Sequence, residues 1–301
     1  YEVYKEMSFS KAARNLFISQ PSLSAAVKKA EKQIGFPIFD RSSNHIQLTE
    51  LGKEYIRSIE IIMDVETGFQ NYINDMKELK SGTIAIGGTN LFASYVLPPL
   101  LSRFTEQYPQ VQVDLVEATT SQLTDRLFSG SLDLLIDNKN MDPAVYQKSF
   151  FCEEHLLLAV PIRLAVNEKM KNYALTASDI RENRHLNSRI PPVPLENFQE
   201  ESFLLLKSGN DTRTRADRIC HNAHVIPKIK LELDQQITAY NLSRYGMGIS
   251  FCSDTLVRHV PDDEGLVYYK LNHQDALREV NFYYKRNRYM PRIVSTFLDM
   301  I

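Results

Sequence analysis

Apolar side chains near the start of the chain recur with helical spacing. Ala12, Ala13, Leu16 and Phe17 follow one another at intervals that place them on one face of a helix. Ser10 can cap the amino end of this helix, because a serine hydroxyl accepts hydrogen bonds from the free N–H groups there. The two alanines are small, which lets another helix approach closely. The pattern predicts a short, closely packed helix.

A second helical pattern follows after a tight break. Ser19 is a good N-cap, Pro21 fits a first turn because its missing N–H costs nothing there, and Gly35 suits the end of a helix. The apolar residues that this helix is expected to bury are Leu23, Ala26, Val27, Ala30 and Ile34. Two such helices in succession predict a helix-turn-helix.

Two short extended runs, 37–39 and 46–48, then flank a polar turn. They predict a β-hairpin wing beside the helix pair, and Thr49 is expected to cap a further helix. Arg41 and His45 lie where a wing can reach a DNA backbone or minor groove. The segment therefore predicts a winged helix-turn-helix.

The exposed face of the second helix carries short polar and cationic side chains near its amino end. Gln and Ser can bond base edges, Lys can bond phosphates, and a helix N-terminus attracts phosphate by itself. A solvated helix face with no ligand is the alternative interpretation. The side chains expected to face DNA on these grounds are Gln20, Ser22, Ser24, Lys28 and Lys29.

The charge of the chain is uneven. The formal net charge of −2 argues at first against a nucleic-acid partner. Residues 1–50, however, contain seven Lys or Arg against five Asp or Glu, whereas residues 50–80 contain four against seven. The excess positive charge therefore lies in the N-terminal segment, where a DNA-binding module needs it.

Residues 50–80 contain no proline, and their apolar positions repeat with a heptad-like spacing. A helix of about 30 residues is about 45 Å long, which is too long to pack fully on one small domain. We therefore expect a dimerising linker helix, with a core helix as the alternative. Its expected contact residues are Tyr55, Ile59, Ile62, Phe69, Ile73 and Met76.

From Gly82 onward, strand and helix patterns alternate, which predicts parallel sheets. One βαβαβ set spans 83–136 and a similar set spans 203–252, with crossings expected near 160 and 270. Two such halves resemble a periplasmic-binding-protein fold. The predicted fold class is α/β with an N-terminal winged helix-turn-helix, a long linker helix and an effector domain of two α/β subdomains.

A chain of 301 residues exceeds the usual size of a single domain, so several domains are expected. The predicted boundaries are a winged helix-turn-helix at 1–49, a linker helix at 50–81 and an effector domain at 82–301, whose first half is 82–160 with 272–301 and whose second half is 161–271. Because the chain begins at Tyr1 and not at a methionine, we expect the N-terminal domain to be incomplete.

Four loops of the α/β region are rich in hydroxyl, amide and glycine residues. Ligands of such sheets bind at the carboxyl ends of strands, in the cleft between the halves. Three of the loops lead into helices, whose N-termini suit an anion, and Arg213 and Arg215 could add charge-assisted bonds. Helix caps without a ligand are the alternative. A small, anionic effector is predicted at Thr89, Asn90, Thr120, Ser121, Ser208, Asn210, Thr212, Gly246 and Gly248.

The run SFSKAARNLFISQPSLSAAVKKAEKQIGFPIFDR, continued by IQLTELG, closely resembles the N-terminal signature of LysR-type transcriptional regulators. Its parts are Ser-Phe before an Ala-Ala helix, Ser-Gln-Pro opening the next helix, Glu and Gly closing it, then Phe-Asp-Arg and Leu-Thr before a Gly. Gly246-x-Gly248 before Ile-Ser-Phe also resembles the family. Ala30 departs from a usual Leu, and Cys252-Ser253 replace a usual Leu-Pro. The resemblance is specific over 8–52 and diffuse over 82–301.

This resemblance implies a ligand-responsive regulator whose partners are double-stranded DNA, a small-molecule effector and further copies of itself. A homodimer, and a homotetramer built as a dimer of dimers, are implied, and RNA polymerase is a further candidate partner. No membrane contact is expected, and the expected location is the cytoplasm. Carried over by the resemblance as DNA-facing positions are Ser19, Gln20, Ser22, Ser24, Lys28 and Arg41.

Other functional classes have little support in the sequence. G-x-S-x-G and H-E-x-x-H are absent, and the glycine pairs complete neither a dinucleotide fingerprint nor a P-loop. We therefore expect no enzyme, no catalytic residue and no cofactor apart from the effector. An enzyme built on the α/β region, and a binding receptor that no longer regulates transcription, are the alternatives.

Cysteine and histidine also suggest no special chemistry. Cys152, Cys220 and Cys252 are expected to be reduced, mostly buried thiols, with a redox-sensing pair as the alternative. His221 and His224 lie three residues apart without a further ligand nearby, so no metal site is expected.

Overall fold

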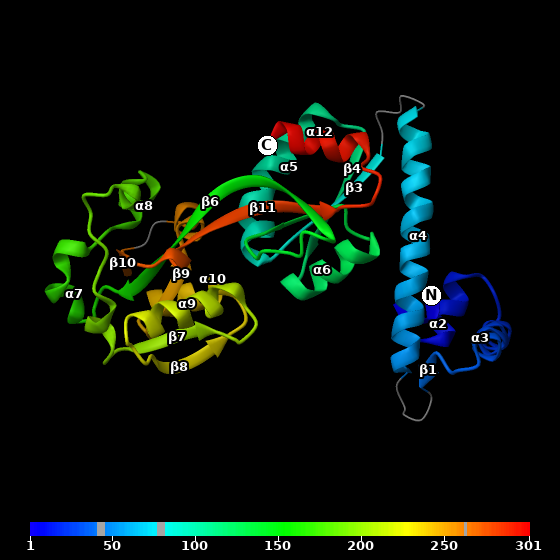
Figure 1. The fold of residues 1–301 in the computed structure, drawn as a ribbon, viewed down its shortest axis with the longest axis horizontal. Coiled ribbons are helices and arrows are strands. Elements are labelled where there is room, and N and C mark those ends of the chain that lie inside the picture. The colour runs from blue at the N-terminus through cyan, green and yellow to red at the C-terminus, as the bar shows by residue number, and fades with distance from the viewer. Residues whose placement is uncertain (41–45, 77–81, 262–263) are drawn as a thin grey trace. The chain divides into compact units, whose positions relative to one another are not determined.

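A computed structural model describes residues 1–40, 46–76, 82–261 and 264–301 (Figure 1). The chain divides into two compact units, each with its own core. The smaller unit consists of Tyr1–Leu79, Asp125–Leu132 and Asn287–Arg292. The larger unit consists of Lys80–Thr124, Asp133–Arg286 and Ile293–Ile301.

The smaller unit contains the helix pair and hairpin that the sequence predicts. Its core is built on Ala12 and Ala13, whose small side chains are fully enclosed, together with Leu23, Ile38 and Phe39. Its elements are α1 (Glu2–Glu6), α2 (Phe9–Asn15), α3 (Gln20–Ile34), the antiparallel strands β1 (Phe39–Asp40) and β2 (Gln47–Leu48), and α4 (Glu50–Met76).

Helix caps define where α2 and α3 begin. The Ser8 hydroxyl, and not that of Ser10, caps α2 by accepting a hydrogen bond from the Lys11 N–H at 3.3 Å. The Ser19 hydroxyl caps α3 as predicted, and Gly35 ends that helix with φ at 87°. A left-handed backbone at this position favours glycine, because it has no Cβ.

Two side chains join the helix pair to the wing and to α4. One carboxylate oxygen of Glu31 accepts the N–H groups of Ile38 and Phe39 at 2.9 and 3.2 Å, which fixes β1 against α3. The Thr49 hydroxyl donates to the carbonyl of Pro37 at 2.7 Å and accepts the N–H of Gly52 at 2.9 Å. Thr49 therefore caps α4 and holds its first turn on the wing.

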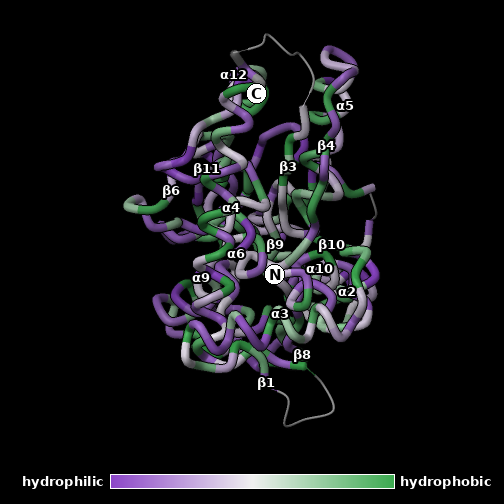
Figure 2. Tube along the Cα trace, turned by 90° about the vertical axis from the view of Figure 1, so that its right-hand side faces the viewer, coloured by the Kyte–Doolittle hydropathy of each residue, from purple (hydrophilic) through white to green (hydrophobic). Residues whose placement is uncertain are grey.

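Polar contacts also bind α4 to the other segments of its unit. The buried carboxylate of Asp64 forms an ion pair with Arg288, whose Nε lies 2.7 Å from Asp64 Oδ1. Asp75 accepts the Tyr289 hydroxyl and the Arg292 N–H, both at 2.8 Å. Hydrophilic and hydrophobic stretches are mixed along the trace in the hydropathy view (Figure 2). No helix of the described residues is long and apolar enough to cross a bilayer.

The larger unit is built on one mixed sheet whose order, over the described residues, is β4-β3-β5-β11-β6-β9-β7-β8, with β10 beside β6. Two groups of parallel strands form its ends, as the two predicted βαβαβ sets require. The first group is β3 (Gly82–Gly88), β4 (Val111–Glu117) and β5 (Leu134–Asp137), and the second is β7 (Ser202–Leu206), β8 (Lys228–Leu233) and β9 (Ile249–Ser253).

Two long strands cross between these groups. They are β6 (Tyr146–Pro161) and β11 (Leu277–Lys285), which pair antiparallel with each other. β11 also pairs with β5 of the first group, whereas β6 also pairs with β9 of the second and with β10 (Leu266–Lys270). The two halves are therefore joined by a pair of hydrogen-bonded strands.

Helices cover the faces of the sheet. Most of their buried residues are aliphatic or aromatic, as in Phe104 of α5 and Phe297 of α12, whose rings meet edge-on at 5.1 Å. The longer helices are α5 (Leu97–Gln107), α6 (Thr120–Ser129), α9 (Asp211–Asn222), α10 (Gln236–Arg244), α11 (Asp254–His259) and α12 (Arg292–Met300). Short helical segments are η1 (Phe92–Val96), α7 (Val166–Lys169), η2 (Lys171–Tyr173), α8 (Ala177–Arg181), η3 (Arg184–Leu186), η4 (Leu195–Phe198) and η5 (Gln274–Ala276).

Two glycines of α4 give a matched test of this packing. A Cβ at Gly52 would lie 2.0 Å from the carbonyl oxygen of Ile38, whereas a Cβ at Gly68 meets only Tyr289 Cβ at 3.9 Å. We expect Gly52→Ala to lower the free energy of unfolding of the smaller unit by about 1–3 kcal/mol through overpacking. Gly68→Ala should raise it by up to about 1 kcal/mol through helix propensity. Thermal unfolding followed by circular dichroism measures both, and equal effects would contradict the close approach at Gly52.

Candidate functional site

The amino end of α3 presents the polar face that the sequence predicts. Gln20, Ser22, Lys28 and Lys29 are exposed, and Ser24 of the same helix is half-buried. All five belong to α3, and with about 3.6 residues per turn Gln20, Ser24 and Lys28 lie on one side of the helix and Ser22 and Lys29 on the other. The polar and cationic residues therefore surround the amino-terminal part of the helix. Arg41 and His45 lie outside the described residues.

Ser19 has a structural task at this surface. Its hydroxyl accepts the Ser22 N–H at 3.3 Å and lies 2.7 Å from the Ser22 hydroxyl. Replacement of an N-cap serine by alanine costs about 1 kcal/mol of helix stability, so Ser19 supports the surface whether or not it contacts a ligand.

Several apolar residues of the helix pair are more exposed than the pattern predicts. Phe17, with φ at 54° between the two helices, is 96% exposed, and Leu16 is 45% exposed. Ala26 and Ile34 of α3 are also exposed. For Leu16 and Phe17 the pattern is wrong because α2 ends at Asn15, which turns the following residues away from the helix face that carries Ala12 and Ala13.

A stripe of apolar side chains runs along α4. Ile62 and Phe69 of the predicted seam are 62% and 60% exposed. Tyr55, Ile59 and Ile73 are half-buried, and the side chain of Met76 lies outside the described part of the structure. Exposed Val65 and Tyr72 fill the intervals of three and four between these residues. The exposed part of the seam, here called the α4 stripe, is therefore Ile62, Val65, Phe69 and Tyr72.

The larger unit contains a polar cavity of about 350 Å³. It lies at the carboxyl ends of the parallel strands, because the segments that follow β3, β4, β5, β7 and β8 all line it. The first half contributes four of the predicted residues and the second half three. These are Thr89, Asn90, Thr120, Ser121, Ser208, Asn210 and Thr212.

Gly246 and Gly248 lie elsewhere, which corrects their assignment to the effector site. Their loop precedes β9, and so it lies at the opposite end of the parallel strands from the cavity. Arg163 donates to the carbonyls of Tyr245 and Gly246 at 2.8 Å, and a Cβ at Gly248 would come 2.7 Å from the carbonyl oxygen of Ser202. Both glycines therefore permit close packing.

Arg213 and Arg215 are also not cavity residues. Arg213 Nη1 donates to the Leu206 carbonyl at 2.7 Å and to Glu232 at 2.5 Å. Arg215 donates to Asp211 at 2.8 Å and to the carbonyl of Asp275 at 3.1 Å. Both guanidinium groups are thus engaged with neighbouring side chains and carbonyls.

An acidic side chain at the end of β5 lines the cavity and was not predicted. Asp137 is buried, with its two oxygens accepting the Lys139 N–H and the Thr120 hydroxyl, each at 2.8 Å. Burial raises the pKa of the Asp137 carboxyl, and these hydrogen bonds offset that effect only in part. The group therefore holds a proton more readily than an exposed aspartate does.

Gln236, the first residue of α10, provides an unused donor. Its Oε1 accepts the Ser253 hydroxyl at 3.1 Å, while its buried Nε2 has no hydrogen-bond partner among the described residues. An unpaired buried amide is costly, so such a group often awaits a ligand or a water. Gln236 lines the cavity, as do Lys139 and Lys207.

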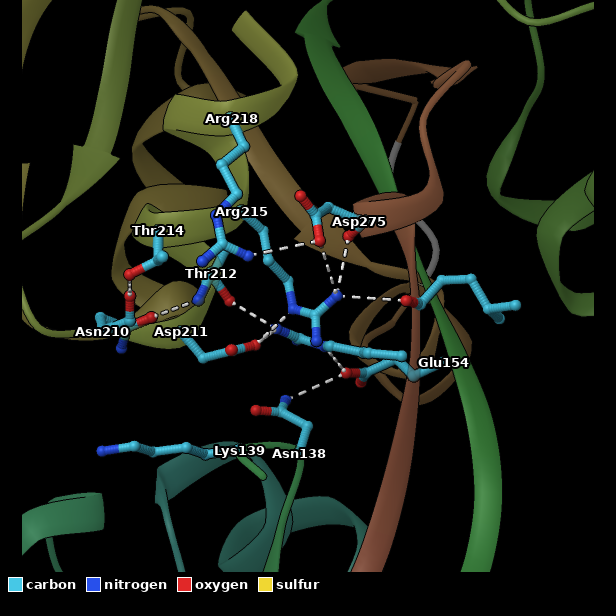
Figure 3. A network of polar contacts seen from close by, with 12 residues as sticks. Asn138, Lys139, Glu154, Asn210, Asp211, Thr212, Thr214, Arg215, Arg218 and Asp275 are labelled. Atoms are coloured by element: carbon cyan, nitrogen blue, oxygen red, sulfur yellow. Dashed lines mark hydrogen bonds and ion pairs between the residues drawn. The ribbon is translucent and has the colours of Figure 1, made fainter. Parts of the chain in front are cut away.

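A buried ionic network ties the cavity to the crossing strands (Figure 3). Arg278 of β11 lines the cavity and donates through Nε to Glu154 of β6 at 2.6 Å. Its Nη1 donates to Asp211 and to the Thr212 hydroxyl of α9, both at 3.0 Å. Asn138, which follows β5, donates to the same Glu154 oxygen at 3.2 Å. One guanidinium thus joins groups from both halves and from both crossing strands.

Charge compensation keeps the buried guanidinium of this network ionised. Arg278 is 4% exposed and Glu154 is fully buried. Burial disfavours the charged guanidinium, but the carboxylates of Glu154 and Asp211 outweigh that effect and raise the pKa of Arg278. No local pattern in the sequence points to these residues, because 124 positions separate Arg278 from Glu154.

The three cysteines are free thiols and do not pair with one another. Cys220 and Cys252 are buried as expected, and Cys152 is half-buried. Burial raises the pKa of the Cys152 and Cys220 thiols to about 12. A thiol with such a pKa is protonated at neutral pH, which makes it a poor nucleophile toward oxidants.

Two family models match the chain. Residues 1–53 match "Bacterial regulatory helix-turn-helix protein, lysR family", and residues 77–301 match "LysR substrate binding domain". The transcriptional regulator YcgK of Bacillus subtilis is 28% identical over 302 aligned positions, which cover 99% of this chain and 90% of that protein. A probable RuBisCO transcriptional regulator of Synechocystis is 25% identical and covers 98% and 81%.

Solved structures share the fold. A full-length variant of OxyR from Pseudomonas aeruginosa superposes with a TM-score of 0.71 at 21% identity, covering 99% of this chain and 91% of that one. Full-length CbnR in complex with its target DNA gives a TM-score of 0.64 at 16% identity, covering 100% and 95%. Because both structures are less than 25% identical to this chain in sequence, their similarity to it shows a shared fold only.

The buried ion pair gives a test of the larger unit. Arg278→Met leaves the Glu154 carboxylate buried and unpaired, which we expect to lower the free energy of unfolding by about 3–5 kcal/mol. Glu154→Leu combined with Arg278→Met removes both charges and should restore at least about 2 kcal/mol of that loss. Urea unfolding followed by circular dichroism measures both.

Lys148 and Glu279 provide the matched control, because they pair on the same two strands at 2.5 Å but are about half exposed. Lys148→Met should cost no more than about 1 kcal/mol. A double variant as unstable as Arg278→Met alone would show that the buried pair is not what destabilises the single variant.

Proposed function

Because this chain belongs to the family of LysR-type transcriptional regulators, we propose that it binds a specific DNA sequence through α3 and that a small anion in the cavity controls this binding. The chain is a regulator with a helix-turn-helix and an effector-binding domain, and not an enzyme. The observation that carries the proposal is the presence of an exposed polar helix end in one unit and of a polar cavity between two halves in the other.

DNA recognition is assigned to the exposed amino end of α3. Gln20 and Ser22 can bond base edges in a major groove, and Lys28 and Lys29 can neutralise phosphates. The free N–H groups of the first helical turn add attraction for a phosphate. Arg41 and His45 of the wing are proposed to contact the backbone or minor groove beside it.

An anionic effector is supported by what surrounds the cavity. The amino ends of α6, α9 and α10 meet there, and each carries a partial positive charge. Gln236 adds its unused donor and Lys139 adds a cation, whereas Lys207 is paired with Asp234 at 2.9 Å. The raised pKa of Asp137 reduces the repulsion that its carboxylate would exert on an anion. The predicted hydroxyl and amide residues would supply further hydrogen bonds.

Control is proposed to act through closure of the two halves. A ligand that bonds residues of both halves stabilises the closed arrangement and shifts the population toward it. The movement would bend the crossing strands β6 and β11, where the Arg278 network lies. The change is then expressed in how dimers associate and how their paired helix-turn-helix modules are spaced on DNA.

Dimerisation is proposed to use the α4 stripe. Four exposed apolar residues at intervals of three and four form a seam of the kind that pairs helices. A two-fold dimer predicts a pseudo-palindromic DNA site. A tetramer built as a dimer of dimers, contact with RNA polymerase and a cytoplasmic location are further parts of this proposal.

Selection from a pool of random duplex DNA at physiological salt tests DNA recognition. The full chain should enrich one dyad-symmetric sequence. Gln20→Ala with Ser22→Ala should weaken binding to that sequence by about 10–100-fold, because each base contact contributes about 1–3 kcal/mol. Fluorescence anisotropy with the selected duplex measures the change.

Gln33→Ala is the matched control, because Gln33 is exposed near the opposite end of the same helix. It should leave the affinity within about twofold, as expected for a surface change away from the contacts. Salt-sensitive binding with no sequence preference would refute the assignment of α3 as the recognition helix.

The α4 stripe is tested by charge insertion. Phe69→Lys should weaken the dimer at least about 30-fold, because an ammonium replaces an aromatic side chain in the seam. Gln70→Lys places the same charge on the neighbouring exposed residue and should leave the dimer intact. Sedimentation equilibrium measures both, and an unchanged dimer in Phe69→Lys would exclude the stripe as the interface.

A further inference from the structure

A second cluster of polar side chains lies in the larger unit and is separate from the cavity. It consists of His155 on β6, His185 on η3, and Asp254 and Arg258 on α11, and none of these lines the effector cavity. The regulatory function proposed above uses none of them. His185 and Asp254 are almost fully buried, whereas the side chains of His155 and Arg258 are 30% and 33% exposed.

Three ligand atoms of this cluster converge. Asp254 Oδ2 lies 2.9 Å from His185 Nε2 and 3.6 Å from His155 Nδ1, and the ligand atoms of the three residues lie within 4.8 Å of one another. A tetrahedral zinc ion with bonds of about 2.0–2.1 Å sets its ligand atoms about 3.3–3.4 Å apart. The two distances to Asp254 bracket that value, so small side-chain movements would close the three atoms around one ion.

The cluster already holds one cation. Arg258 Nη2 lies 2.9 Å from Asp254 Oδ2 and 3.5 Å from His185 Nε2, so the guanidinium occupies the side of the carboxylate that an ion would take. The Asp254 carboxylate is therefore directed toward a positive charge.

We propose that His155, His185 and Asp254 form a binding site for a divalent transition-metal ion of the zinc class, which displaces the Arg258 guanidinium when it binds. Two imidazoles and one carboxylate are a donor set that zinc accepts, with a fourth position left for water. The partly exposed side chains of His155 and Arg258 provide the entry path, because the arginine can swing into solvent.

The protonation of His185 is compatible with this exchange. Its Nδ1 is buried and has no hydrogen-bond partner among the described residues. The tautomer of a histidine is normally fixed by the hydrogen bond of its other nitrogen. In the ion-free chain the contact with Asp254 favours the ring proton on Nε2. Because no partner engages Nδ1, that proton can move to Nδ1 when a metal replaces the contact, which leaves the Nε2 lone pair for the metal.

A metal ion bound at this site would cross-link three elements that are distant in sequence. The ion would join η3 and α11 to β6, one of the two strands that cross between the halves. His155 already follows Glu154 of the Arg278 network along that strand. The metal would thus bind beside the crossing strands without entering the effector cavity.

Metal binding by the full chain, freed of metal with a chelator, tests the proposal. Isothermal titration with Zn²⁺ should give one ion per chain, and Co²⁺ should produce the visible d–d bands of tetrahedral coordination. His155→Asn should weaken Zn²⁺ binding at least about 100-fold and abolish the bands, since loss of even an outer partner costs about 10–100-fold. Arg258→Gln should tighten binding about tenfold by removing the competing cation.

His221→Asn is the matched control, because His221 is exposed and His224 lies close by in sequence, so that the two could hold an adventitious ion. It should leave Zn²⁺ affinity and the Co²⁺ bands unchanged. No stoichiometric binding, or binding lost in His221→Asn and retained in His155→Asn, would overturn the proposal. Because His155 is partly exposed, its variant should keep the circular dichroism spectrum of the native chain, so that loss of binding reports on the ligand and not on folding.

Discussion

The buried pair of Arg278 and Glu154 is the interaction on which the larger unit depends. These residues face each other in the register of the two crossing strands, and their charges are compensated by each other and by Asp211. Removing two ions from water is expensive, so the pair is stable only while β6, β11 and α9 hold their relative positions. The same guanidinium lines the cavity. Cavity shape and strand geometry are therefore coupled through one side chain.

Around this centre, the polar residues that line the cavity gather at one end of the parallel strands. Parallel strands such as β5 are completely buried and apolar except at their carboxyl ends, where Asp137 begins a run of polar residues. The helix N-termini that follow face the same end, because each strand of a βαβ unit points the same way. The opposite end, with Gly246 and Gly248, serves close packing. This polarity brings polar groups of both halves together around one cavity.

The smaller unit leaves two surfaces exposed, the amino end of α3 and the α4 stripe. Its helix pair is held by a small core and by the carboxylate of Glu31, which leaves the amino end of α3 free for a partner. The α4 stripe leaves apolar surface exposed along a helix that its own unit covers only in part. Exposed apolar residues in such a regular row mark an interaction surface. In the proposed function, the first surface binds DNA and the second binds another copy of the chain.

Local features were predictable from the sequence, and long-range pairings were not. Local hydrogen bonding and backbone preference are enough to predict the helix pair, the cap at Ser19 and the hydroxyl-rich loops. Ser10 was wrongly assigned as the cap of α2, because Ser8, two residues earlier, has that role. Gly246 was misassigned because a glycine-rich loop has the same composition at either end of a strand. The pairing of Arg278 with Glu154 was not predictable, because only the fold brings β11 and β6 together. The sequence thus determined which elements form and which surfaces are polar, because those properties are local. The tertiary structure decided which charges are buried together, because burial depends on everything packed around them.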